Sequence, residues 1–109
     1  MSDSHRDVGD AGESFALAHL TAKGLRLLLR NYRCKGGELD LVMLDGKTLA
    51  LIEVRLRSDD GFGGAAASVT PTKQRRLIVA ANHLLLTHRE LSGYRARFDV
   101  VALGRGRVE

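Results

Sequence analysis

The segment from residue 38 to residue 57 constrains the fold of this chain more than any other. Two strand-like runs, ELDLVML (38–44) and TLALIEVR (48–55), flank the dipeptide Asp45-Gly46. Asp-Gly between apolar, β-prone runs is a strong short-range signal for a hairpin. We therefore predict that the two runs pair antiparallel, at the centre of a β-sheet.

The length of the hairpin loop decides which residues face each other. A two-residue loop (45–46) places Glu38 opposite Glu53, whereas a loop that takes in residues 47 and 48 as well places Asp40 opposite Glu53. Side chains along a strand alternate between its two faces, so only a loop of odd length would separate the charged residues. Both even-length registers gather four of them on one face: Glu38, Asp40, Glu53 and Arg55.

Three carboxylates on one face of a hairpin repel each other and need positive charge among them. Arg55 supplies one positive charge, which leaves a deficit that suits an oxygen-seeking divalent ion such as Mg²⁺ or Mn²⁺. Such an ion polarises a phosphoryl oxygen and lowers the pKa of a bound water, and the backbone carbonyl of Val54 is a candidate further ligand. The alternative is that the acids are half-exposed strand residues neutralised by Arg55, Arg57 or Arg97.

The remaining segments predict two helices and two further strands. An amphipathic helix follows Asp10, is capped by Asp7 or Asp10 and ends at Gly24; a strand covers 25–32 and a turn 33–37. After a glycine-containing loop (58–70), Thr70 caps a second helix with Pro71 at its first position. Its expected buried stripe is Leu77, Ile78, Ala81, Leu84, Leu85 and His88. A last strand covers 97–103.

The order of these elements predicts an α/β fold. It runs α-β-β-β-α-β, which implies one mixed central sheet flanked by helices. The chain of 109 residues is the length of one domain, so we expect a single domain over 1–109. The chain has a single cysteine, so it cannot form an intrachain disulfide. It shows neither a signal-type segment nor an apolar run long enough to cross a bilayer. We therefore expect a cytoplasmic protein without a membrane partner.

The charge of the chain is unevenly distributed. Residues 1–60 hold 9 basic and 10 acidic side chains, whereas residues 61–109 hold 8 basic and 3 acidic ones. Arginine accounts for 13 of the 17 cations, and its planar guanidinium suits phosphate. A basic region of this kind favours a nucleic acid as partner, although the codon usage of a GC-rich genome alone produces the same excess of arginine.

Several short motifs together resemble one known family. They are Gly12-Glu13, Arg30-Asn31-Tyr32-Arg33, GELDLV (37–42), EVRLR (53–57), Lys73 with Arg76, and RFDVV (97–101). In order and spacing they resemble the YraN-like uncharacterised family, which looks like a minimal member of the PD-(D/E)xK nuclease superfamily. The resemblance covers about residues 10–103 and implies a restriction-endonuclease-like core.

The resemblance also implies a role for each matching position. Asp40 and Glu53 would be the metal-binding carboxylates, with Mg²⁺ or Mn²⁺ as cofactor, and Glu13 an auxiliary acid. Arg55 stands where the superfamily usually has its catalytic lysine; arginine stays protonated, so it orients water or stabilises negative charge without acting as a base. We expect three cations to contact the nucleic-acid backbone: Lys73 and Arg76 at the start of the second helix, and Arg57.

The function predicted on these grounds is metal-dependent cleavage of nucleic-acid phosphodiesters, with DNA favoured over RNA. A homodimer would allow so small a domain to grip two strands. The first alternative is a non-catalytic nucleic-acid binding or assembly protein that retains the nuclease fold. A second is an interaction module with no nucleic-acid partner.

Overall fold

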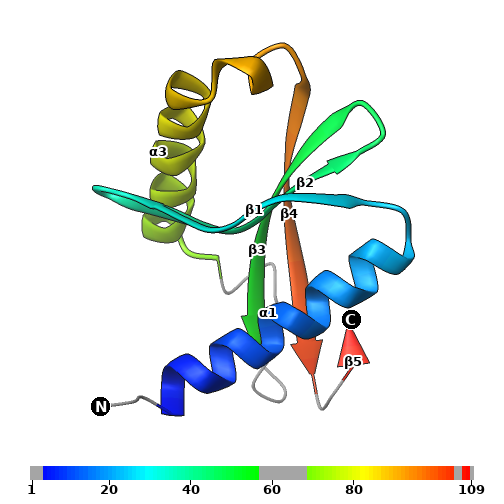
Figure 1. Ribbon diagram of the computed structural model, residues 1–109. Coiled ribbons are helices and arrows are strands. Elements are labelled where there is room, and N and C mark those ends of the chain that lie inside the picture. Colours follow the sequence, from blue (N-terminus) through cyan, green and yellow to red (C-terminus); the bar gives the residue numbers. More distant parts are fainter. Residues whose placement is uncertain (1–3, 57–68, 105–106, 109) are drawn as a thin grey trace.

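The structure, a computed structural model, describes residues 4–56, 69–104 and 107–108 (Figure 1). The expected order α-β-β-β-α-β is confirmed, with a short 3₁₀ helix and a two-residue strand in addition. The elements are α1 (Ser4–Ala22), β1 (Arg26–Cys34), β2 (Gly37–Asp45), β3 (Thr48–Leu56), α3 (Pro71–Thr87), η1 (Arg89–Leu91), β4 (Arg95–Gly104) and β5 (Arg107–Val108).

The five strands form one mixed sheet in the order β1-β2-β3-β4-β5. The pairs β1–β2, β2–β3 and β4–β5 are antiparallel, whereas β3 and β4 are parallel. A parallel pair needs a crossover connection, and the segment containing α3 provides it. The mixed sheet predicted from the element order is therefore confirmed.

The β2–β3 hairpin adopts the second of the two expected registers. Asp45 pairs with Thr48 and Leu41 pairs with Ile52, and Gly46 has a φ of 62° in the turn between them. This register points Asp40 toward Glu53, so the alternative that places Glu38 opposite Glu53 is wrong. Glycine adopts this left-handed conformation without the steric cost that a side chain would bring.

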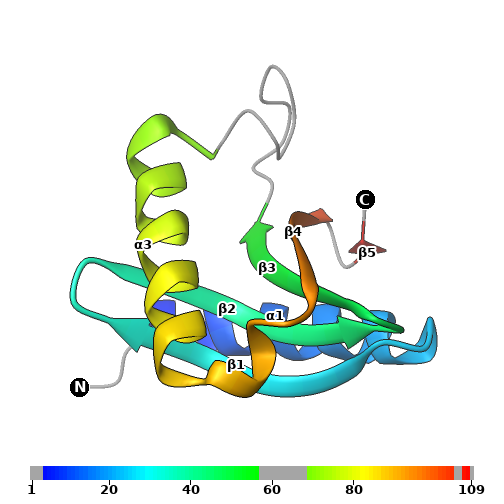
Figure 2. The same cartoon turned by 90° about the horizontal axis from the view of Figure 1, so that it is seen from above.

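The two long helices lie on different sides of the sheet (Figure 2). Alternate residues of β3 supply the two cores: Leu49 and Leu51 pack toward α3, whereas Ala50 and Ile52 pack toward α1. The strands β2 and β3 are thus buried on both faces, as the continuous apolar runs in their sequence require. The described helices include none that is long and apolar enough to cross a membrane.

A close approach of α3 to the beginning of β2 depends on Gly37. A Cβ atom at this position would lie 2.2 Å from the carbonyl oxygen of Arg76 and 2.8 Å from the backbone nitrogen of Ala80. Both are backbone atoms, which cannot move aside as a flexible side chain could. Gly37 therefore allows α3 to rest on β2 and brings the first turns of α3 beside the hairpin.

Several predicted boundaries and faces are wrong. The helix α1 begins at Ser4, so Asp7 and Asp10 lie within it and do not cap it. The β1–β2 turn is confined to 35–36 instead of the predicted 33–37. Ile78 is half exposed, and Ala80 is buried in its place because the helix face over Gly37 must carry a small residue. The predicted cap is confirmed, since Thr70 accepts the N–H of Lys73. Most of the predicted loop (58–70) lies outside the described residues.

Candidate functional site

The candidate site is a pocket where β2 and β3 separate. It takes residues from both helices and three strands: Gly12, Glu13, Glu38, Asp40, Glu53, Val54, Arg55, Lys73 and Leu103. The pocket therefore holds all four charged residues expected on one face of the hairpin. It also holds the auxiliary acid Glu13 and the helix residue Lys73.

Asp40 bridges the two strands at the point where their pairing ends. Leu41 and Ile52 are the last paired residues in this direction, and beyond them the backbone N–H of Val54 donates to Oδ2 of Asp40 at 2.7 Å. Asp40 is the one charged residue buried in the part of the chain that the structure describes, with 8% of its surface exposed. The bond compensates part of the cost of burying this carboxyl and fixes its orientation.

Burial raises the pKa values of both central carboxyls. Desolvation and then the charge of Asp40 raise the pKa of Glu53 to about 7, against the opposing effects of Arg55 and Lys73. Desolvation also raises the pKa of Asp40 above its usual value, and the hydrogen bond from Val54 opposes this change. Two neighbouring carboxyls with raised pKa values favour a cation between them, because the cation stabilises both charged forms.

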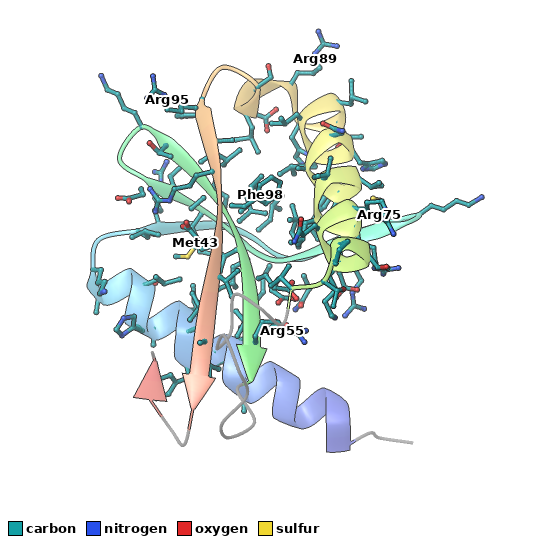
Figure 3. The ribbon with its side chains drawn as sticks, turned by 180° about the vertical axis from the view of Figure 1, so that it is seen from behind. Met43, Arg55, Arg75, Arg89, Arg95 and Phe98 are labelled. Atoms are coloured by element: carbon teal, nitrogen blue, oxygen red, sulfur yellow. The ribbon has the colours of Figure 1, made fainter. Side chains whose placement is uncertain are left out.

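Arg55 lies near the end of β3 (Figure 3). Its Nη1 approaches Oε2 of Glu53 at 3.5 Å, and 28% of the arginine side chain is exposed. This distance is at the limit of a hydrogen bond and involves one oxygen of the carboxylate. The contact neutralises Glu53 in part, and the guanidinium stays at the rim of the pocket within reach of an incoming anion.

Glu13 is held at the pocket by an arginine of the neighbouring strand. Nε of Arg30 on β1 lies 3.6 Å from Oε1 of Glu13, and its Nη2 donates to Oγ of Ser14 at 2.8 Å. Consecutive residues of α1 are therefore tied to one side chain of the sheet. This arrangement orients the helix so that Glu13, whose side chain is 13% exposed, faces the acids of the hairpin.

The first turns of α3 bring cations to the same place. Lys73 lines the main pocket, and a neighbouring pocket is bounded by Glu38, Glu53, Lys73, Arg76 and Leu77. Nη2 of Arg76 lies 3.8 Å from Oε1 of Glu38, and about half of each side chain is exposed. Arg76 therefore offsets the outer carboxylate while its guanidinium remains accessible. Arg57, the third predicted phosphate contact, lies outside the described residues.

Arg97, also predicted to neutralise the acids of the hairpin, forms its ion pairs away from the candidate pocket. Arg97 donates to Asp99 at 2.8 Å and to Asp45 at 3.0 Å, so it serves the far end of the hairpin. No three Asp, Glu, His or Cys side chains in the described ranges are placed to hold a metal ion by themselves. A divalent ion at Asp40 and Glu53 would complete its coordination with water, backbone carbonyl or substrate oxygens, which is the usual behaviour of Mg²⁺.

The sequence alone left three contributions to the site unidentified. These are the N–H of Val54, the ion pair from Arg30 and the space provided by Gly37. Arg30 belongs to the motif RNYR, but its position in a strand gives no indication of its partner on α1. Gly37 is the first residue of β2. Glycine is unfavourable in a strand, so its presence there indicates that another backbone segment approaches closely.

Comparison with known proteins identifies the family of the chain. The profile of the family described as "Uncharacterised protein family UPF0102" matches residues 12–103, which contain every described residue of the site. The chain belongs to the UPF0102 family. This confirms the resemblance to the YraN-like family.

Curated UPF0102 proteins from several bacteria are similar over most of their length. One from Cupriavidus necator is 58% identical over 93% of this chain and 76% of its own length. One from Saccharophagus degradans is 46% identical over 96% of this chain and 89% of its own length. One from Pseudomonas putida is 54% identical over 88% of this chain and 77% of its own length.

Proposed function

We propose that this UPF0102 protein is a metal-dependent nuclease that cleaves phosphodiester bonds of nucleic acid. The observation that carries the proposal is the pair Asp40 and Glu53, one buried and one partly buried carboxyl at the end of a hairpin, with Asp40 fixed by the N–H of Val54. Maintaining two acids side by side in a desolvated place costs stability, and raised pKa values of this kind cluster at functional sites. The resemblance to the PD-(D/E)xK superfamily agrees with the same assignment.

The donor set fits Mg²⁺ or Mn²⁺ better than a softer metal. Asp40 and Glu53 offer carboxylate oxygens, and the described lining of the pocket contains neither histidine nor cysteine. Bound there, the ion would activate water and polarise the phosphate. The protein's own part is to hold both carboxylates in fixed positions, which the strand positions and the Val54 bond achieve.

The cations around the pocket suit a phosphodiester. Arg55 remains protonated at neutral pH and can donate hydrogen bonds to a nonbridging phosphate oxygen or orient a water, but it does not act as a base. Lys73 and Arg76 lie on the first turns of α3, where the helix dipole also favours an anion. The proposal therefore assigns chemistry to the acids and substrate positioning to the cations, with DNA as the favoured substrate in the cytoplasm.

Cleavage assays on defined substrates test the proposal. Single-stranded, duplex, nicked and branched DNA, and RNA, are incubated with Mg²⁺ or Mn²⁺ and with a chelator. We expect metal-dependent cleavage that Asp40→Asn abolishes and that Asp45→Asn, an exposed acid at the far end of the same hairpin, leaves unchanged. Cleavage that persists in a folded Asp40→Asn protein would refute the site assignment.

A non-catalytic nucleic-acid binding protein is the second candidate, and the contact between Arg55 and Glu53 favours it. The guanidinium already offsets one of the two carboxylates, which weakens the attraction for a metal. This candidate predicts salt-sensitive binding without turnover. A gain of cleavage in Arg55→Lys would show that the rest of the site is competent, and absence of binding even at low salt would contradict both candidates.

A further inference from the structure

Asn31 has a backbone conformation that strands do not normally contain. Its φ is 57°, and among the residues that the structure describes it is the one residue other than glycine with a positive φ. It lies inside β1, between Arg30 and Tyr32 of the motif RNYR. This left-handed conformation brings Cβ close to a carbonyl oxygen, and asparagine is among the few residues that tolerate it. A costly conformation of this kind persists only where the surrounding structure holds it.

The side chains of β1 change faces at Asn31. Side chains two positions apart in a strand normally share a face of the sheet. Arg30 contacts Glu13 on α1 at 3.6 Å. The hydroxyl of Tyr32, by contrast, lies 3.1 Å from Oγ1 of Thr87 on α3, which covers the other side of the sheet (Figure 2). The regular alternation along β1 is thus interrupted at Asn31.

The same interruption occurs on β2, directly across from Asn31. The residues before and after Asn31 pair with Leu41 and Leu39, so the residue that lies opposite Asn31 is Asp40. Leu39 packs in the core on the α3 side of the sheet, whereas Leu41 packs in the core on the α1 side. Both strands therefore change faces at one step of the ladder, and this step consists of Asn31 and Asp40.

The interruption explains where the carboxyl of Asp40 lies. In a regular strand this side chain would stand perpendicular to the sheet, and the residues before and after it would share the opposite face. Those two residues instead lie on different faces, and the carboxyl between them reaches the backbone N–H of Val54 on the neighbouring strand β3. The bond from Val54 and the contact of Arg30 with Glu13 thus depend on the same change of faces.

We propose that Asn31 is a positioning residue of the candidate site, because its left-handed backbone holds the change of faces that directs Asp40 to Val54 and Arg30 to Glu13. Its effect on metal binding and cleavage rests on the proposed function. The role requires the backbone conformation, so glycine, which adopts a positive φ freely, should replace asparagine. Valine should not, because a β-branched side chain is a poor fit to this conformation.

Paired substitutions on β1 test the conformational requirement. Arg33, exposed and paired with Glu38, is the matched control, and there valine should be tolerated and glycine should destabilise the strand. At position 31 the order should be inverted. Asn31→Gly should stay near the parent protein, whereas Asn31→Val and Asn31→Ala should lower the folded-to-unfolded ratio by about 5- to 30-fold. Urea denaturation measures this ratio, and the same order at both positions would overturn the proposal.

Amide hydrogen exchange tests whether Asn31 acts on Asp40. The N–H of Val54 should exchange about tenfold faster in Asn31→Val, relative to the N–H of Leu51 in the middle of β3, and at the parent rate in Asn31→Gly. If Asn31→Val does not fold, Asn31→Ala gives the same comparison. A destabilised variant in which Val54 keeps its protection relative to Leu51 would leave Asn31 with a purely structural role and overturn the proposal.

Metal binding connects Asn31 to the proposed function. With Mn²⁺ as the probe, calorimetry should show binding about tenfold weaker in Asn31→Val than in the parent protein, and unchanged in Asn31→Gly. Equal affinity in a folded Asn31→Val protein would overturn the proposal. Neither denaturation nor amide exchange involves a metal or a nucleic acid. A parent protein that neither binds metal nor cleaves would therefore refute the proposed function, while the Val54 amide still decides the role of Asn31.

Discussion

The backbone N–H of Val54 donates to Oδ2 of Asp40 at 2.7 Å, at the point where β2 and β3 stop pairing. The side chain of Asp40 thereby takes the place of a β2 backbone group as the hydrogen-bond partner of Val54 on β3. The bond stabilises the fold because it satisfies a backbone donor. It also orients the candidate site because it fixes a carboxyl that faces Glu53. Asp40 thus has a structural role and a chemical role that substitutions can separate.

Asparagine and alanine at position 40 should have different effects. Asp40→Asn keeps an oxygen that accepts from Val54, whereas Asp40→Ala leaves that N–H without its partner at a cost of about 1–3 kcal/mol in the free energy of unfolding. Both variants should lose metal-dependent cleavage. Urea denaturation measures the first effect and cleavage assays the second; equal destabilisation by the two substitutions would contradict the structural role of the bond.

The stability of the protein should fall as the pH rises from about 4.5 to about 7. The pKa of Glu53 is raised from 4.5 to about 7, so the folded protein binds this proton more tightly than the unfolded chain does. The stabilising effect is complete below the unfolded pKa and is lost as the pH passes through the folded pKa. Glu53→Gln should therefore be more stable than the parent protein above pH 7, by up to about 3 kcal/mol.

Denaturant titrations at several pH values measure this difference. The matched control is Glu90→Gln, which changes an exposed acid on η1 and should retain the slope of the parent protein. Part of the slope should persist in Glu53→Gln, since burial raises the pKa of Asp40 in the same direction. Identical profiles for Glu53→Gln and the parent protein would show that Glu53 is not desolvated.

Mg²⁺ or Mn²⁺ should raise the melting temperature at pH 8, and a chelator should reverse the change. Both carboxyls must be ionised to bind the ion, so the shift should decrease as the pH falls below 7. Asp40→Asn should weaken binding by at least about 100-fold, the upper end of the loss caused by changing an outer-shell partner. Differential scanning fluorimetry and calorimetry measure this, and an equal shift in Asp40→Asn would place the ion elsewhere.

Gly37→Ala should destabilise the protein, whereas Gly93→Ala should not. A Cβ at position 37 would lie 2.2 Å from the carbonyl oxygen of Arg76, but a Cβ at position 93 would meet nothing within 4 Å. Overpacking against backbone costs about 1–3 kcal/mol and should displace the start of α3. Thermal unfolding measures the cost, and cleavage should decrease because Lys73 moves with the helix; a neutral Gly37→Ala would contradict the close packing.

Local patterns in the sequence were sufficient to predict the main elements of the fold and most of the charged residues that line the candidate pocket. The hairpin followed from Asp45-Gly46 between apolar runs, and the period of two placed Asp40, Glu53 and Arg55 on one face. Thr70-Pro71 identified the start of α3 in the same way, because a helix cap is a property of neighbouring residues. These predictions depend on interactions between residues close together in the chain.

Only the tertiary structure decided how distant segments meet. The register that points Asp40 toward Glu53, the space over Gly37, the contact of Arg30 with Glu13 and the choice of Ala80 over Ile78 for the buried face all depend on packing between elements. Sequence periodicity defines the faces of a helix or strand but not its partner. Close packing of α3 on β2 selects that partner, and it carries Lys73 to the carboxylates of the hairpin.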